Sequence, residues 1–228
     1  MLHTKIHRAT VFAVVACLPA LGGAQGAVAG RVSIQERPGE TTGDIANTVI
    51  YLMPRGERKL RVGTVKVPMA MSARQFSPRV RVVTPGSAVE YPNQDPFSHN
   101  IFSTAAGAAF DLGTYAGGTM KAATFKKTGA FPIYCNIHAK MTAYVVVVPT
   151  PYSVVAGADG RWILPGVPAG SYELHVWHER APEVVQGVEV VSTGLADLMT
   201  SLDARGYQAK AHMNKFGKDY TSAGKDRY

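Results

Sequence analysis

One short segment of the chain carries three side chains that can bind a metal ion. Cys135, His138 and Met141 supply a thiol, an imidazole and a thioether close together in the sequence. A further imidazole, that of His99, lies upstream and is followed directly by Asn100. Thiolate and thioether are soft donors that select Cu(I), whereas imidazole suits several transition metals. These four side chains therefore form a candidate metal site.

The mixture of donors favours copper over zinc. Two histidines, one cysteine and one methionine are the ligand set of a type 1 copper site, which is trigonal with a long axial methionine. Zinc seldom uses methionine and prefers four nitrogen, sulfur or oxygen donors. A fixed geometry between the preferences of Cu(II) and Cu(I) keeps reorganisation small, so that an electron moves quickly. We therefore predict one type 1 copper ion.

The use of cysteine agrees with this interpretation. The chain has two cysteines, and Cys17 lies in an N-terminal stretch that resembles an export signal. Cys135 would then be alone, with no partner for an intrachain disulfide. A single thiol in an exported protein needs a reason. One explanation is that Cys135 is a buried, unreactive thiol. The more specific explanation is that it is a metal ligand.

The N-terminus predicts export. Lys5 and Arg8 form a positive region, an apolar run covers residues 9–21, and small residues end in the A-x-A pattern at residues 27–29. The run is too short to be a convincing membrane span. We expect a signal peptide over residues 1–29, a periplasmic or secreted bacterial protein, and no transmembrane helix in the mature chain.

A lipid anchor is the alternative reading of the N-terminus. Residues 14–17 resemble a lipobox, in which Cys17 would become the lipidated first residue. The apolar residues 18–21 that follow argue against it, because lipoproteins usually continue with polar residues.

Hydrophobic patterning predicts an all-β protein. Short runs of high β propensity are separated by Gly and Pro turns, and we find no convincing long amphipathic helix. The runs expected to be strands cover residues 31–34, 47–53, 80–82, 88–91, 120–125, 131–135, 144–148, 161–164, 172–177 and 184–191.

The residues around the four donors resemble those of plastocyanin-like cupredoxins. Residues 85–86, 93–95 and 97–100 look like that family's first-ligand region, and residues 129–138 look like its ligand loop. The spacing from His138 to Met141 is similar to that in amicyanin and pseudoazurin. The resemblance covers residues 63–148 and implies a Greek-key β-sandwich.

The resemblance also implies roles for the donors. His99, Cys135 and His138 would be the equatorial copper ligands and Met141 the axial ligand. Asn100 would lie behind them and stabilise the ligand loop.

The flanks resemble a different sandwich. Residues 30–62 and 149–202 look like a carboxypeptidase regulatory-like domain, which implies one discontinuous β-sandwich with the cupredoxin inserted between its early and late strands. Exported bacterial proteins of this composite type are sometimes labelled methylamine-utilisation proteins.

Charge is concentrated near the C-terminus. The formal net charge is +8, and residues 203–228 are rich in Lys and Arg and poor in apolar residues. We expect a flexible basic tail, either merely solvated or in contact with acidic redox partners or anionic surfaces. Nothing in it suggests nucleic-acid binding.

Other candidate donors favour structural roles. His175 and His178 are an odd offset apart, which would place them on opposite faces of a strand. Met69 and Met71 could bind Cu(I) transiently, but we expect them to pack in a core. Lys140 lies between two candidate ligands and would orient an acidic partner or remain solvated.

These features predict an electron carrier and no enzyme. Oxidases need further copper ions and paired histidines, and no H-E-x-x-H zinc-peptidase motif is present. The expected partner is a redox protein such as a c-type cytochrome or a periplasmic dehydrogenase. The alternative is a copper storage or delivery protein, or a surface interaction module.

Overall fold

The computed structural model of the chain describes residues 25–41, 43–56 and 60–220. The prediction of an all-β protein is confirmed, since the described part contains β-strands and one short 3-10 turn, η1 (Ile45–Asn47). No helix within these ranges is long and apolar enough to cross a membrane. Residues 1–24, with Cys17 and most of the expected signal peptide, lie outside the described residues.

The strands follow one another at short intervals along the chain. They are β1 (Gln25–Gln35), β2 (Val49–Pro54), β3 (Lys66–Pro68), β4 (Ala70–Ser72), β5 (Gln75–Ser77), β6 (Val80–Val83), β7 (Ser87–Pro92), β8 (His99–Ser103), β9 (Phe110–Tyr115), β10 (Met120–Phe125), β11 (Gly129–Cys135), β12 (Thr142–Val147), β13 (Ser153–Val155), β14 (Arg161–Pro168), β15 (Gly170–His178), β16 (Ala181–Val190) and β17 (Leu195–Asp203).

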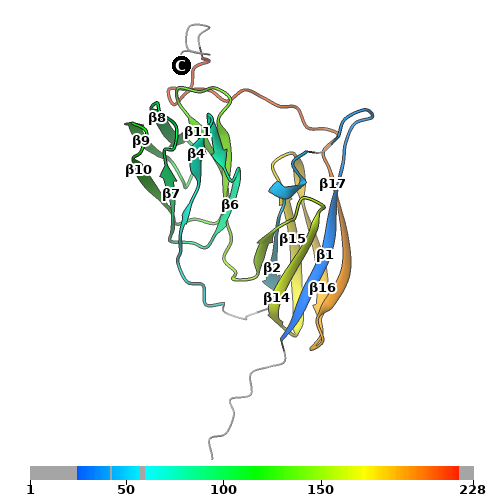
Figure 1. The fold of residues 1–228 in the computed structure, drawn as a ribbon. Helices are drawn as coiled ribbons and strands as arrows, with labels where there is room; N and C mark the ends of the chain where they lie inside the picture. The colour runs from blue at the N-terminus through cyan, green and yellow to red at the C-terminus, as the bar shows by residue number, and fades with distance from the viewer. Residues whose placement is uncertain (1–24, 42, 57–59, 221–228) are drawn as a thin grey trace, which may run out of the picture.

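The strands form two separate sets of sheets (Figure 1). Strands β3–β12 form the inserted sandwich, with sheet orders β10-β7-β3 and β6-β12-β11-β8-β9 and the small pair β4-β5. Strands β1, β2 and β13–β17 form the flanking sandwich, with sheet orders β14-β1-β17 and β13-β2-β15-β16. The chain leaves the flanking sandwich after β2 and returns to it at β13.

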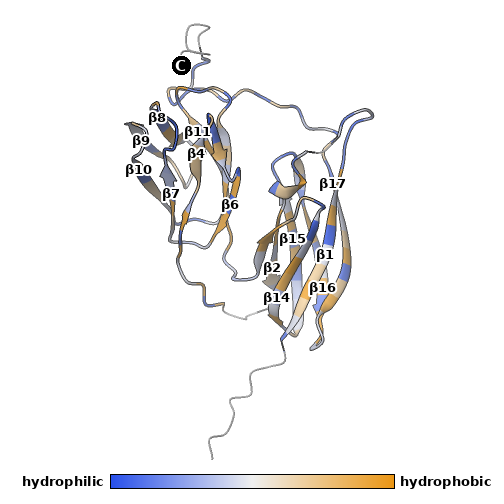
Figure 2. Cartoon of the chain, in the orientation of Figure 1, coloured by the Kyte–Doolittle hydropathy of each residue, from blue (hydrophilic) through white to orange (hydrophobic). Residues whose placement is uncertain are grey.

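Each sandwich has its own apolar core. In β15, Tyr172, Leu174 and Val176 are buried while the residues between them are partly exposed, as expected for a strand with one face on a core. Figure 2 shows hydrophobic and hydrophilic segments mixed along the strands of both sandwiches, as this alternation requires. The inserted sandwich buries aromatic and β-branched side chains, among them Tyr91, Phe125, Ile133 and Val145.

A third apolar cluster joins the two sandwiches. Val80 and Val146 of the inserted sandwich pack with Val49 of the flanking sandwich, and Trp177 covers them. Beside this cluster, the Arg79 guanidinium donates two hydrogen bonds of 2.6 and 2.8 Å to the Glu179 carboxylate. The Glu179 side chain is only 3% exposed, so the ion pair is largely withdrawn from water on its acidic side.

Replacing Arg79 with alanine is expected to destabilise the protein. The change would leave the buried Glu179 carboxylate without its partner, at a cost of about 1–3 kcal/mol in the free energy of unfolding. Urea denaturation of the full chain measures this. Arg161→Ala is the control, because its pair with Asp159 is exposed on both sides and is worth less than about 0.5 kcal/mol. Equal effects of the two changes would contradict the prediction.

The expected end of the signal peptide at residue 29 lies within strand β1. Strand β1 begins at Gln25, and Val28 is fully buried in the flanking core. Cleavage after Ala29 would remove this core residue together with the pairing of β1 to Val167 and Leu164 in β14. A boundary at residue 29 would therefore fall inside β1.

Candidate metal centre

Strand pairing brings the first two candidate ligands together. His99 is the first residue of β8 and Cys135 the last residue of β11. These strands are antiparallel neighbours, with Cys135 opposite Ile101 and Tyr134 opposite Phe102. The start of β8 therefore lies beside the end of β11, and both ligands are fully buried.

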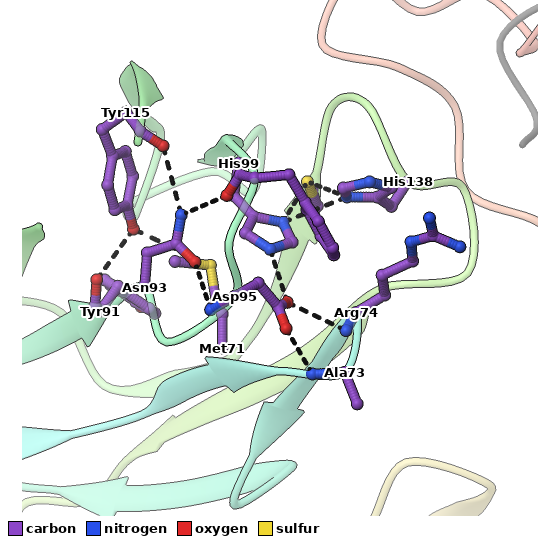
Figure 3. Close-up of polar contacts among 11 residues, drawn as sticks. Met71, Ala73, Arg74, Tyr91, Asn93, Asp95, His99, Tyr115 and His138 are labelled. Atoms are coloured by element: carbon purple, nitrogen blue, oxygen red, sulfur yellow. Dashed lines mark hydrogen bonds and ion pairs between the residues drawn. The ribbon is translucent and has the colours of Figure 1, made fainter. Parts of the chain in front are cut away.

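The donor atoms of three predicted ligands converge (Figure 3). The Cys135 sulfur lies 3.6 Å from Nδ1 of His99 and 3.5 Å from Nδ1 of His138. The two Nδ1 atoms are 3.1 Å apart. Two imidazole nitrogens and one sulfur thus face a common point, which is what a trigonal metal site requires.

The loop from Cys135 to Met141 closes on itself. The Cys135 N–H donates to the Met141 carbonyl at 3.2 Å, and the Met141 N–H donates to the His138 carbonyl at 3.0 Å. Met141 is 1% exposed and belongs to the same core as Cys135. The turn therefore brings the fourth predicted ligand back beside the cysteine.

Asn100 supports this loop through its backbone. Its carbonyl accepts the Asn136 N–H at 2.8 Å, while its side chain donates to Asp111 at 2.6 Å. The amide side chain that the resemblance placed behind the ligands thus contacts Asp111.

Burial governs the protonation of the cysteine. Loss of hydration raises the pKa of the Cys135 thiol, and the backbone N–H groups of Asn100, Ile137 and His138 that point at the sulfur lower it by less. A cation at the donor cluster would favour the thiolate, because metal binding deprotonates a coordinating thiol.

An acidic residue that we did not predict to have a role orients His99. Oδ2 of Asp95 lies 2.9 Å from Nε2 of His99, and both groups are buried. The carboxylate accepts the Nε2–H, so the lone pair of the imidazole is left on Nδ1, the atom that faces Cys135. A carboxylate behind a ligating histidine is the usual way to fix its tautomer. In the sequence, the one sign of this role is an acidic residue, Asp95, four positions before the candidate ligand His99.

The Asp95 carboxylate is itself held by the backbone. It accepts the N–H groups of Ala73 at 2.6 Å and Arg74 at 3.0 Å. These two residues have φ angles of 52° and 58°, in the left-handed region, and their amides point at one carboxylate as a result. Burial acts to raise the pKa of Asp95, but hydrogen bonds from Arg74, His99 and Ala73 hold it below its ordinary value.

Asn93 completes the support behind His99 (Figure 3). Its side-chain oxygen accepts the Asp95 N–H at 3.0 Å, and its side-chain nitrogen donates to the carbonyls of Phe97 at 2.8 Å and Tyr115 at 3.3 Å. The buried Asn93 amide thus holds together the residues that lead into β8, the turn at Asp95 and the end of β9.

Both candidate histidine ligands are neutral near pH 7. Burial lowers the pKa of His138 to about 4, helped by the nearby His99 and Arg74. Burial also lowers the pKa of His99, although Asp95 opposes the change. Neutral imidazole is the form that binds metals, so the donor cluster fits a soft or borderline transition metal.

One side of the centre opens to a groove of about 520 Å³. His138 and Met141 line it together with Arg74, Phe76 and Lys140. The Arg74 guanidinium lies 5.2 Å from the centre of the Phe97 ring, in a cation–π contact. The exposed edge of the donor cluster is therefore the His138 edge, and Arg74 and Lys140 make it positively charged.

The predicted flexible tail makes specific contacts where the structure describes it. Residues 212–220 lie against the loop that follows β11, and Tyr220 donates a hydrogen bond to the Cys135 carbonyl at 2.8 Å. This differs from the expectation of a free basic segment over residues 203–228, and residues 221–228 lie outside the described residues.

The remaining histidines and methionines have other surroundings. His175 stacks on Tyr51 at 4.5 Å, whereas His178 is buried on the other face of β15, as predicted. Met69 and Met71 are fully buried, which confirms their packing role.

Fold and donor cluster together define a class: an all-β protein with a buried centre of two imidazoles and one thiol in one of its two sandwiches. Solved structures similar to this chain include cupredoxins. A purple cupredoxin from Nitrosopumilus maritimus is 21% identical, with a TM-score of 0.32 and coverage of 37% of this chain and 99% of that one. Amicyanin from Paracoccus versutus is 18% identical, with a TM-score of 0.35 and coverage of 43% and 98%. No protein-family model and no curated protein matches the chain.

Proposed function

We propose that this chain is an exported type 1 copper protein that carries single electrons between redox partners. The observation that carries the proposal is the convergence of three donor atoms, Nδ1 of His99, Sγ of Cys135 and Nδ1 of His138. Met141, at the end of the same loop, would be the fourth ligand. Copper bound there would supply a Cu(II)/Cu(I) couple, in which one electron enters from a reduced partner and leaves to an oxidised one.

The chain's own residues would keep the two oxidation states close in structure. Asp95 holds His99 in one tautomer and one orientation, and Asn93 holds Asp95. Cys135 is fixed between two strands and the loop. Rigid donors do not move when the charge at the centre changes, which favours fast electron exchange over storage.

The surface beside His138 supports an acidic redox partner, such as an acidic c-type cytochrome or a dehydrogenase. Arg74 and Lys140 are exposed on the rim of the groove, whereas Arg79 is neutralised by Glu179. Complementary charge raises the rate of encounter more than the final affinity. Electron exchange with such a partner should therefore slow as the salt concentration rises.

The flanking sandwich would be the carboxypeptidase regulatory-like part of the proposal. Its strands β1 and β2 precede the inserted sandwich, and β13–β17 follow it. We assign it no reaction, and the protein as a whole would be no enzyme.

Voltammetry of the copper-loaded full chain tests the function. The proposal predicts a reversible one-electron couple, and copper that leaves only slowly when EDTA is added in excess. A protein without a reversible couple, which yields its copper to EDTA at once, would instead be a copper delivery protein. That outcome would refute electron transfer while leaving the metal site in place.

A further inference from the structure

The C-terminal segment links the flanking sandwich to the metal centre. It begins where β17 ends at Asp203, and the Ala204 N–H is still bound to the Gln35 carbonyl of β1 at 3.0 Å. Figure 1 shows it crossing from there to the end of the inserted sandwich where β8 and β11 lie. The segment thus spans from one sandwich to the ligands of the other.

Two hydrogen bonds attach the segment to the ligand loop. The Tyr220 hydroxyl donates to the carbonyl of Cys135, at 2.8 Å. The Lys215 N–H donates to Oδ1 of Asn136, the next residue of the loop, at 2.9 Å. Both contacts fall at the cysteine ligand and its neighbour.

Aromatic stacking fixes the segment beside the same ligand. The His212 ring lies on the Tyr134 ring, with centroids 4.4 Å apart and planes at 17°. Tyr220 is edge-on to His212, with ring centroids 5.2 Å apart and its hydroxyl 3.3 Å from Nδ1 of His212. Tyr134 directly precedes Cys135, so the segment contacts three consecutive residues, 134–136, at the end of β11 and the start of the loop.

An ion pair extends the contact to the other strand of the site. Nζ of Lys215 lies 2.7 Å from Oδ2 of Asp111, whose Oδ1 accepts the Asn100 side chain at 2.6 Å. Asn100 follows His99. Lys215 therefore contacts Asn136 of the loop through its backbone N–H. Through its side chain it contacts Asp111, which binds Asn100 beside His99.

The segment carries its own local turn. Oδ1 of Asn214 accepts the N–H groups of Phe216 and Lys218, and the Asn214 N–H donates to the Lys218 carbonyl. Gly217 allows this turn with a φ angle of 71°. The turn presents the Lys215 N–H toward Asn136.

We propose that residues 204–220 act as a clamp, by which the flanking sandwich holds the Cys135–Met141 loop closed and slows the release of a bound metal ion. Tyr220, Lys215 and His212 are positioning residues, since they act on the ligands through Cys135, Asn136 and Tyr134. The clamp covers the cysteine edge of the centre and leaves the His138 edge for partners. The expected effect on metal release rests on the copper site proposed above. The contacts between the clamp and the loop are formed without the metal.

Two point variants of the full chain and one shortened chain test the clamp. These three proteins, the control and the wild-type reference all carry Cys17→Ser, so that Cys135 is the only thiol. Tyr220→Phe removes one hydroxyl, Lys215→Glu sets a carboxylate against Asp111, and a third variant ends at residue 211. Tyr152→Phe is the matched control, because Tyr152 lies in the flanking sandwich away from the loop. The urea midpoint of each protein shows whether the fold is retained.

The first measurement uses the metal-free proteins. The Cys135 thiolate attacks an aromatic disulfide reagent and breaks its S–S bond. Cys135 forms a mixed disulfide with one half of the reagent, and the other half leaves as a coloured thiolate. We expect this reaction to be about threefold faster in Tyr220→Phe and about tenfold faster in the shortened chain, the range that loss of one to several hydrogen bonds allows. The second measurement is copper transfer to excess EDTA, which should accelerate in the same order.

The outcomes separate the clamp from the proposed function. Wild-type thiol reactivity in Tyr220→Phe, Lys215→Glu and the shortened chain would overturn the clamp, whatever the metal does. Faster thiol reaction in the variants, with a wild-type protein that binds no copper, would uphold the clamp on the loop and refute the copper site. An equal acceleration in Tyr152→Phe would also overturn the clamp, because the effect would then not depend on the loop contacts.

Discussion

Cys135→Ala is expected to abolish tight copper binding. The substitution removes the only sulfur among the three converging donors and leaves two imidazole nitrogens near an apolar core. We expect copper affinity to fall by more than about 100-fold, beyond the range seen when residues behind the ligands are changed. Competition with a chelator of known affinity measures it.

The control for this substitution is His175→Ala. His175 stacks on Tyr51 in the flanking sandwich and should leave copper affinity unchanged. Copper binding of wild-type strength in Cys135→Ala would place the metal elsewhere and contradict the assigned donor set. Because alanine is small and apolar, a loss of folding is not expected, and circular dichroism checks this.

Asp95→Asn is expected to weaken copper binding about 10- to 100-fold. The amide keeps Oδ1 for the N–H group of Ala73 but would place its NH₂ at the Oδ2 position, which accepts the Arg74 N–H and faces Nε2 of His99. Nε2 would then accept a hydrogen bond, and the proton would move to Nδ1, where the metal must bind. The histidine is present but in the wrong tautomer.

Two measurements test this tautomer argument. Nitrogen NMR of the metal-free protein should show the His99 proton on Nε2 in the wild type and on Nδ1 in Asp95→Asn. Copper affinity should fall in parallel. Asp197→Asn is the control, since Asp197 is exposed and its φ angle of 60° suits asparagine. An unchanged tautomer and affinity in Asp95→Asn would show that Asp95 has no positioning role.

The donor set could be predicted because it is local. Cys135, His138 and Met141 lie in one loop, and the choice of thiol, imidazole and thioether indicates the metal without any structure. His99 could be added because it is an upstream imidazole followed directly by an asparagine, in a region that resembles the first-ligand region of cupredoxins. Many strands could be found from alternation and turn residues, although β8 was missed because it is buried throughout and does not alternate. Strands β3, β4, β5, β9, β13 and β17 were also missed.

The contacts that hold the donors could not be predicted in the same way. The role of Asp95 depends on a turn in which Ala73 and Arg74 adopt positive φ, and neither residue type signals that conformation. The docking of Tyr220 depends on how two sandwiches are placed, which local composition does not encode. A basic, polar segment reads as a tail, because its ordering comes from contacts with the ligand loop and little from burial of its own side chains.

The A-x-A pattern near the N-terminus is also ambiguous in sequence. An A-x-A pattern at residues 27–29 is a cleavage signal by composition. The same small residues lie in β1, where Val28 fills the flanking core. Small residues suit both a peptidase site and close strand packing, so the sequence pattern cannot distinguish them.

The most direct test of the central claim is the visible absorption and EPR spectrum of the purified protein with one equivalent of Cu(II). We expect an intense thiolate-to-copper absorption, a blue or green colour, and a narrow copper hyperfine splitting, all lost in Cys135→Ala. A pale spectrum like that of aqueous Cu(II), unchanged by Cys135→Ala, would contradict the type 1 site and with it the proposed electron transfer.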